Sequence, residues 1–207
     1  MRRGERIFRE MLHRYYTGGE RFFSQKELAR SCGLSLGTVN PLVKRLELMG
    51  MVECRPLGLR LLDPERMLIY WAARRDLFGD IIYATYAPES PQEIESVLSP
   101  LGVLTANSGF KRLFEGISVN YSEVYLYARK GEVQSRYGPR EGKPNLFVLR
   151  PDEHLQKLSQ GGVAPLVQIY VDLWQLGQLG GSVREELEKK LRAAPLRAIE
   201  GVMSPQQ

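Results

Sequence analysis

The chain has 207 residues, 43% hydrophobic and 26% charged, a balance typical of a globular protein with its own buried core. No run of about 18 apolar residues occurs, so no membrane-spanning helix is expected, and the N-terminus lacks the apolar stretch of a secretory signal. Its cysteines are Cys32 and Cys54 and its histidines His13 and His154, which excludes a zinc cluster or disulfide framework and favours a reduced, cytoplasmic protein with no metal or cofactor.

The net charge of +5 is distributed unevenly along the chain. Residues 1–78 contain 15 Lys and Arg against 9 Asp and Glu, whereas the remainder contains 14 against 15. Neutralisation of phosphates needs local cations, so this surplus favours a polyanionic partner for the N-terminal third. A solvated basic face would give the same composition.

The first two predicted helices have different signals. Apolar residues between Ile7 and Tyr15 recur with the spacing of one buried helical stripe. Ser24 and Glu27 have the spacing of a capping box, which predicts a short helix over residues 25–31. Gly33 supplies a left-handed residue to end that helix.

A longer helix is predicted from Ser35, its N-cap, to Met49, followed by two strands. Residues 51–55 and 59–62 read as strands joined by a turn at 56–58, and Pro64 begins another helix. The apolar face of the long helix carries the residues at i, i+3, i+4 and i+7, which are Val39, Leu42, Val43 and Leu46.

Residues 5–75 resemble winged helix-turn-helix DNA-binding domains, both in element order and in local sequence. The resemblance is carried by Leu28 to Ser35, by Thr38-Val39 and by Leu46 to Val52. It implies that the helix after Ser35 enters the major groove of duplex DNA, while the hairpin touches the flanking backbone.

Seven residues are the expected DNA contacts. Ser35 and Thr38 lie at a helix start, which favours phosphate or base-edge contacts, and Asn40 can pair with adenine. Lys44 and Arg45 lie further along and suit phosphates, and Arg55 and Arg60 flank the tip of the hairpin. For each of these residues, a solvated surface role is the alternative.

Two other features of this region carry expectations of their own. Pro41 lies inside the predicted recognition helix and removes one backbone hydrogen bond, so we expect a kink or an irregular first turn. Cys32 and Cys54 are expected to be small buried hydrophobic residues.

The remaining chain predicts a small mixed α+β domain over 79–196 and a disordered tail over 197–207, which gives an α+β fold class for the whole chain. Strands are expected at 81–86, 123–128 and 146–149, with a loop at 136–145. Helices are expected at 91–101, opened by a capping box at Ser90 and Glu93, and at 105–115, 165–174 and 182–193.

Catalytic patterns are scarce in this second domain, so an enzyme is not expected. Asp152, Glu153 and His154 could form an acid–base cluster, but the same residues are an ordinary helix start. Asp172 lies mid-helix between apolar residues and is expected to be a buried, hydrogen-bonded acid. Gly161-Gly162 is not followed by a lysine-bearing phosphate loop.

Parts of this domain resemble the AbiEi-type antitoxins of type IV toxin–antitoxin systems. The resemblance is carried by Pro165 to Trp174, which matches a Pro-x-x-Gln-x-Tyr-x-Asp-Leu segment, and by Gly180 to Glu185 and Asn145 to Pro151. Ser182-Val183 departs from the Arg-Gly usual in that family. The resemblance implies an antitoxin-like autorepressor that counters a nucleotidyltransferase-type toxin without forming a stable complex.

The sequence thus predicts a regulator that binds specific double-stranded DNA sequences through its first domain. Whether the second domain forms a homodimer, senses a ligand or meets a partner protein is left open. One alternative is a ligand-responsive repressor with no toxin. Another is a nuclease-like enzyme, for which Asp152, Glu153 and Lys157 would have to converge on a metal.

Overall fold

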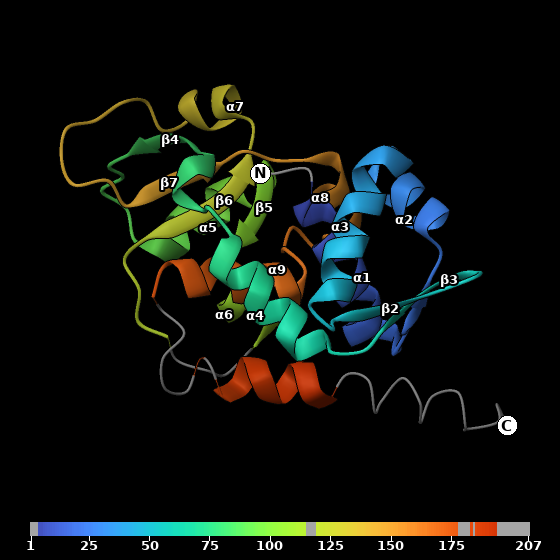
Figure 1. Cartoon of the computed structure of the whole chain (residues 1–207). Coiled ribbons are helices and arrows are strands. Elements are labelled where there is room, and N and C mark those ends of the chain that lie inside the picture. Colours follow the sequence, from blue (N-terminus) through green and yellow to red (C-terminus); the bar gives the residue numbers. More distant parts are fainter. Residues whose placement is uncertain (1–3, 115–118, 178–182, 184, 194–207) are drawn as a thin grey trace, which may run out of the picture. The chain divides into compact units, whose positions relative to one another are not determined.

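A computed structural model describes residues 4–114, 119–177, 183 and 185–193. The chain is a mixed α+β protein, as predicted, and it divides into two compact units (Figure 1). The first unit contains described residues 4–74, 183 and 185–193; the second contains 75–114 and 119–177. The predictions made for Gly180 to Ser182 and for the tail 197–207 lie outside the described residues.

The first unit consists of helices around a small antiparallel sheet whose strand order is β1-β3-β2. Its helices are α1 (Glu5–Gly18), α2 (Gln25–Cys32), α3 (Leu36–Leu48) and α4 (Pro64–Arg74). Its strands are β1 (Phe22–Phe23), β2 (Val52–Arg55) and β3 (Gly58–Leu61). The β2–β3 hairpin was predicted, whereas β1, a two-residue strand, was not.

The core of this unit joins residues distant in the sequence. Trp71 of α4 is fully buried and stacks on Phe8 of α1, with ring centroids 6.3 Å apart. Residues 185–193, which were predicted to belong to the second domain, are helical and lie in the first unit, and Leu187 and Leu191 are buried. A side chain at Gly58 would clash with the Phe23 carbonyl, so glycine is needed where β1 lies against β3.

The capping box predicted at Ser24 and Glu27 is wrong. Ser24 is the N-cap of α2, but its side chain makes no capping hydrogen bond. The Glu27 carboxylate instead lies 2.9 Å from the Arg14 guanidinium of α1. An ion pair with charge-assisted hydrogen bonds is stronger than a neutral capping bond, so the contact with α1 determines where Glu27 points.

The second unit contains a four-stranded sheet in the order β4-β7-β6-β5. Strands β6 and β7 are parallel, and the other two pairs are antiparallel. The strands are β4 (Ile81–Thr85), β5 (Gly102–Thr105), β6 (Val124–Ala128) and β7 (Leu146–Leu149). The helices are η1 (Phe78–Asp80), α5 (Pro91–Leu98), α6 (Ala106–Leu113), α7 (Lys130–Gln134), α8 (Glu153–Leu158) and α9 (Leu166–Gln175).

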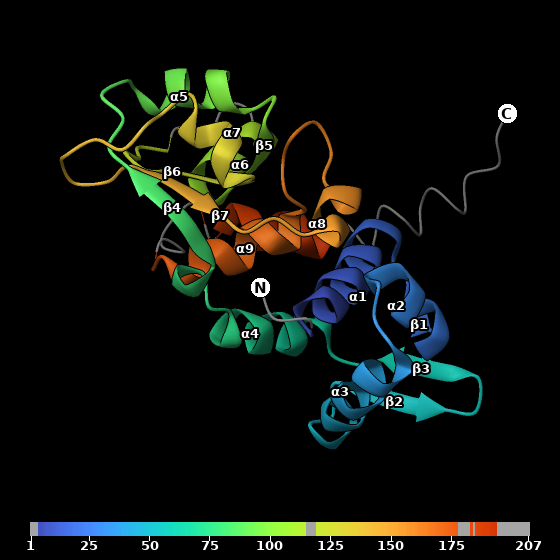
Figure 2. The same ribbon diagram turned by 90° about the horizontal axis from the view of Figure 1, so that it is seen from above.

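Helices cover both faces of this sheet, and Figure 2 shows α5 and α7 on one side and α9 on the other. Alternation along β6 explains the layering. Leu126 belongs to the core that also contains Ile94 of α5 and Val133 of α7. The hydroxyl of its neighbour Tyr127, on the opposite face, donates to Asp172 of α9 at 2.6 Å.

Local sequence patterns predicted most of these helices and strands, and the observed bounds differ from the predicted ones mainly at the ends. The capping box at Ser90 and Glu93 is present, and Asp152 caps α8 by accepting the Leu155 N–H. Helix α5 ends at Leu98 rather than 101, because the chain turns there and enters β5, a strand that was not predicted. Helix α7 was not predicted.

Asp172 is a fully buried, hydrogen-bonded acid, as predicted, and it lies at the centre of a polar network. One carboxylate oxygen accepts from Thr105 at 2.7 Å and from Tyr127, and the other accepts from Gln168 at 3.0 Å and from Arg75 at 3.1 Å. The Arg75 guanidinium also donates to Asp80. The network therefore ties η1, β5, β6 and α9 together within the second unit.

Candidate nucleic-acid interface

Helix α3 has one buried face and one exposed face. Of the four residues predicted for the buried face, Val39, Val43 and Leu46 are fully buried in the core of the first unit and Leu42 is half-buried. A helix rotates by about 100° per residue, so residues 37, 41, 44 and 48 point the opposite way. All four are exposed, and Asn40 and Arg45 flank them, also exposed. The exposed side of α3 thus presents Asn40, Lys44 and Arg45 beside the apolar residues Gly37, Pro41 and Leu48.

The start of α3 leaves its first backbone N–H groups open. Ser35 is the N-cap, but its side chain makes no capping bond and lies 3.1 Å from the Thr38 hydroxyl instead. The N-terminal N–H groups of a helix carry partial positive charge and attract anions. Ser35 is exposed and Thr38 is half-buried, so the two hydroxyls stand together at an anion-attracting helix end.

Helix α3 continues through Pro41 to Leu48. Pro41 has no N–H, so the Gly37 carbonyl lacks the donor that a helix supplies four residues on. A Cβ at Gly37 would meet nothing closer than the Ser35 hydroxyl at 3.7 Å, so the fold itself tolerates a side chain there. At Gly37 and Pro41 the exposed face therefore carries no long side chain and presents only backbone and a proline ring.

The outer face of the β2–β3 hairpin carries Glu53, Arg55 and Arg60. Leu59 and Leu61, which point the other way, are fully buried. Glu53 is the register partner of Arg60 and also pairs with Arg55 at 2.9 Å. At the turn Leu57 is 86% exposed, so Arg55 and Arg60 lie near a protruding tip, as predicted.

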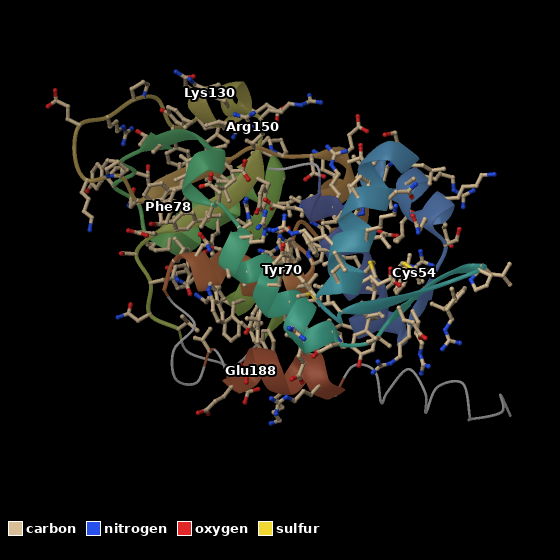
Figure 3. The ribbon with its side chains drawn as sticks, in the orientation of Figure 1. Cys54, Tyr70, Phe78, Lys130, Arg150 and Glu188 are labelled. Carbon is tan, nitrogen blue, oxygen red and sulfur yellow. The ribbon has the colours of Figure 1, made fainter. Side chains whose placement is uncertain are left out.

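Glu47 connects α3 to the hairpin. Its carboxylate accepts the backbone N–H of Cys54 at 2.8 Å, which joins α3 to β2. Cys54, labelled on the hairpin in Figure 3, is half-buried, so the prediction that both cysteines are buried is confirmed only for Cys32. Burial raises the pKa of the Cys54 thiol, Glu47 raises it further, and Lys44 lowers it.

Several basic residues of the first unit serve its own structure. Arg9 is fully buried, and Arg6 donates to the Cys32 carbonyl. Arg14 pairs with Glu10, Glu20 and Glu27, and the Arg21 guanidinium lies over the Tyr15 ring. The surplus of Lys and Arg over Asp and Glu therefore overstates the positive charge that is available on the surface to a polyanion. On α3 and the hairpin, the exposed cations are Lys44, Arg45, Arg55 and Arg60.

All seven residues expected to contact DNA lie on α3, at its N-cap or on the hairpin. Six of them are exposed and Thr38 is half-buried. Sequence reasoning missed Glu47, whose role depends on a contact with Cys54 that no local pattern shows. It also missed Glu53 as a neighbour of both arginines of the hairpin.

The alternative acid–base cluster does not form a shared site. The Asp152 carboxylate caps α8, Glu153 and Lys157 are exposed on that short helix, and His154 is buried. Within the described residues, no group of three or more His, Cys, Asp or Glu side chains could hold a metal ion. None of the helices in the described part of the chain is both long and apolar enough to span a bilayer.

Residues 24–53 match a family model described as winged helix-turn-helix DNA-binding. The matched segment contains α2, α3 and the start of β2, which are the elements that carry most of the surface described above. Neither the curated proteins nor the solved structures gave a match to the chain. The match therefore supports a DNA-binding regulator and leaves the role of the second unit unassigned.

Proposed function

We propose that this winged helix-turn-helix chain is a transcriptional regulator that binds specific sequences of double-stranded DNA. In this proposal α3 lies in the major groove and the β2–β3 hairpin contacts the flanking backbone. The observation that carries it is the exposure of Asn40, Lys44 and Arg45 on α3, within the segment that matches the DNA-binding family. A chromosomal target would place the protein in the cytoplasm.

The proposed contacts divide into two chemical roles. Asn40 can bond two edge atoms of adenine at once, and Thr38 reaches a base edge from the first turn. Ser35 and the nearby backbone N–H groups suit a phosphate, as do Lys44 and Arg45. Arg55 and Arg60 would bind phosphates beside the major-groove site, with Glu53 limiting how strongly they attract DNA.

Single substitutions distinguish these roles. Lys44→Ala and Arg60→Ala should weaken binding to all DNA sequences alike, because phosphates carry no sequence information. Asn40→Ala and Thr38→Ala should relax specificity at individual positions, by about 1–3 kcal/mol for a good base contact. Competition assays with systematically mutated operator sites measure both effects. Unchanged sequence preference in both the Asn40 and the Thr38 variant would contradict base readout by α3.

We further propose an antitoxin-like autorepressor, on the strength of the resemblance of residues 145–151 and 165–174 to AbiEi-type antitoxins. The second of these segments forms α9 and supplies Gln168 and Asp172 to the buried network. Co-expression with the product of a neighbouring nucleotidyltransferase gene should relieve growth arrest without a stable complex. If growth arrest is not relieved, the antitoxin proposal is wrong, and the chain is a repressor that has the same DNA-binding unit but no toxin partner.

A further inference from the structure

The second unit contains a polar cleft of about 500 Å³ between α5 and α6. Its walls carry Glu95 and Ser96 of α5, Ser99 just after α5, and Ser108, Lys111 and Arg112 of α6. Small-molecule sites in proteins typically have volumes of about 300–1,000 Å³, so this cleft is large enough to hold one. Its polar lining is suited to a ligand with charges and hydroxyl groups.

Ser108 is the residue in the cleft that is hardest to explain by folding alone. Its side chain is 1% exposed, and its hydroxyl oxygen has no hydrogen-bond partner. It lies close to the Tyr121 hydroxyl without the geometry of a full hydrogen bond, and that hydroxyl donates to Glu95. A buried hydroxyl without a partner destabilises the fold, and a bound polar group would remove that cost.

The other charged groups of the cleft divide into an acceptor and two cations. One oxygen of the buried Glu95 carboxylate accepts the Tyr121 hydroxyl at 2.6 Å. The Lys111 ammonium lies 5.7 Å from the centre of the Tyr121 ring, and Arg112 is exposed one residue further along α6. An anionic group fits beside the two cations, and a hydroxyl donor fits beside Glu95.

We propose that this cleft binds a phosphorylated, hydroxyl-bearing small molecule, such as a sugar phosphate or a nucleoside monophosphate. Lys111 and Arg112 would hold the phosphate by charge-assisted hydrogen bonds. Ser96, Ser99 and Ser108 would donate to or accept from its oxygens, and Glu95 would accept from a ligand hydroxyl. The site lies wholly within the second unit and does not depend on the DNA-binding proposal.

Isothermal titration of the full chain tests the site, with glucose 6-phosphate and AMP as probes at constant ionic strength. Both phosphorylated probes should give saturable binding, and glucose and adenosine should not. Inorganic phosphate should bind at least tenfold more weakly than the better probe, because it cannot reach Glu95. The proposal is overturned if neither glucose 6-phosphate nor AMP gives saturable binding, or if inorganic phosphate binds as tightly as the better of the two.

Variants with matched charge locate the binding. Lys111→Ala with Arg112→Ala should raise Kd at least tenfold. Arg129→Ala with Lys130→Ala removes the same charge from α7 and its N-cap in the same unit and should change Kd less than twofold (Figure 3 labels Lys130). An equal loss in both pairs would mean unspecific attraction and would overturn the site.

Ser108→Ala provides a second, independent readout. It should raise Kd for the phosphorylated probes about threefold without lowering Tm, because the hydroxyl it removes has no partner in the fold. Unchanged Kd in this variant would remove Ser108 from the site and contradict the proposal. No DNA is present in these titrations, so their failure is distinguishable from a failure of the DNA-binding proposal.

Discussion

Asp172 shows how a buried acid, expected from its place between apolar residues, serves the structure of the fold. A carboxylate removed from water needs compensating charges and donors. Asp172 has both, in Arg75 and in the hydroxyls of Thr105 and Tyr127. Every partner comes from the fold itself, and the carboxylate is fully buried, so its role is to hold the elements of the second unit together.

Asp172→Asn should therefore destabilise the second unit by about 3 kcal/mol or more, because it leaves the buried Arg75 charge with one fewer anion. Hydrogen exchange of β6 amides under native conditions measures the loss in that unit. Asp152→Ala is the control, since it removes the side chain that caps α8, a contribution of about 1 kcal/mol. Equal losses in the two variants would contradict a central role for the network.

Cys54 reports on the contact between α3 and the hairpin. Burial and Glu47 both raise the pKa of its thiol, so its thiolate fraction at pH 8 should be smaller than that of a free cysteine. Glu47→Gln should lower the pKa and speed alkylation by iodoacetamide, and Lys44→Ala should slow it, because Lys44 favours the thiolate. Peptide mapping by mass spectrometry measures the Cys54 rate. A change of the same sign in both variants would argue against this arrangement.

At the scale of the element, α3 combines features that a helix chosen for stability alone would avoid. Gly37 and Pro41 both lower helix propensity, and both lie on the exposed face rather than in the core. Packing does not require glycine at position 37, since the space there is open. In the DNA-binding proposal, the lack of long side chains there would let the backbone of α3 approach the floor of the major groove closely.

Gly37→Leu tests that use. The substitution should leave Tm unchanged or raise it, because leucine has the higher helix propensity by up to about 1 kcal/mol. Affinity for the operator should fall at least tenfold, because the new side chain would hold α3 away from the bases. Gly131→Leu in α7, where the space is also open, is the control and should leave affinity unchanged. Normal DNA binding by the Gly37 variant would place another surface against DNA.

At the scale of the whole molecule, the net charge matters less than where the exposed cations lie. Several arginine side chains of the first unit serve its own structure: Arg9 is buried, and Arg14 pairs with Glu20 and Glu27. The second unit has its own exposed cations, including Arg129, which pairs with Glu132. A plain count of Lys and Arg would not separate these groups from those on α3 and the hairpin.

The salt dependence of DNA binding by the full chain should reflect four phosphate contacts, from Lys44, Arg45, Arg55 and Arg60. Counterion release then gives a slope of log Kobs against log salt of about −3.6 per bound chain. Lys44→Ala with Arg60→Ala should reduce its magnitude by about 1.8, and Arg129→Ala with Lys130→Ala should not change it. A flat salt titration, or a slope that follows the second pair, would contradict the proposed surface.

The sequence by itself determined the features that depend on near neighbours. The apolar periodicity located the buried face of α3, and the caps at Ser90 and Asp152 marked two helix starts correctly. The β2–β3 hairpin followed from its turn residues. These signals are local, because hydrogen bonds and side-chain spacing within a helix or hairpin involve residues a few positions apart.

Only the tertiary structure decided the features that join distant segments. Glu27 leaves its expected cap because Arg14 of α1 attracts it, and Glu47 bonds Cys54 because α3 packs beside β2. Arg75 and Asp172 are 97 positions apart and meet only in the folded second unit. A charged side chain pairs with whichever partner the packing brings close, and the sequence does not state which segments will be neighbours.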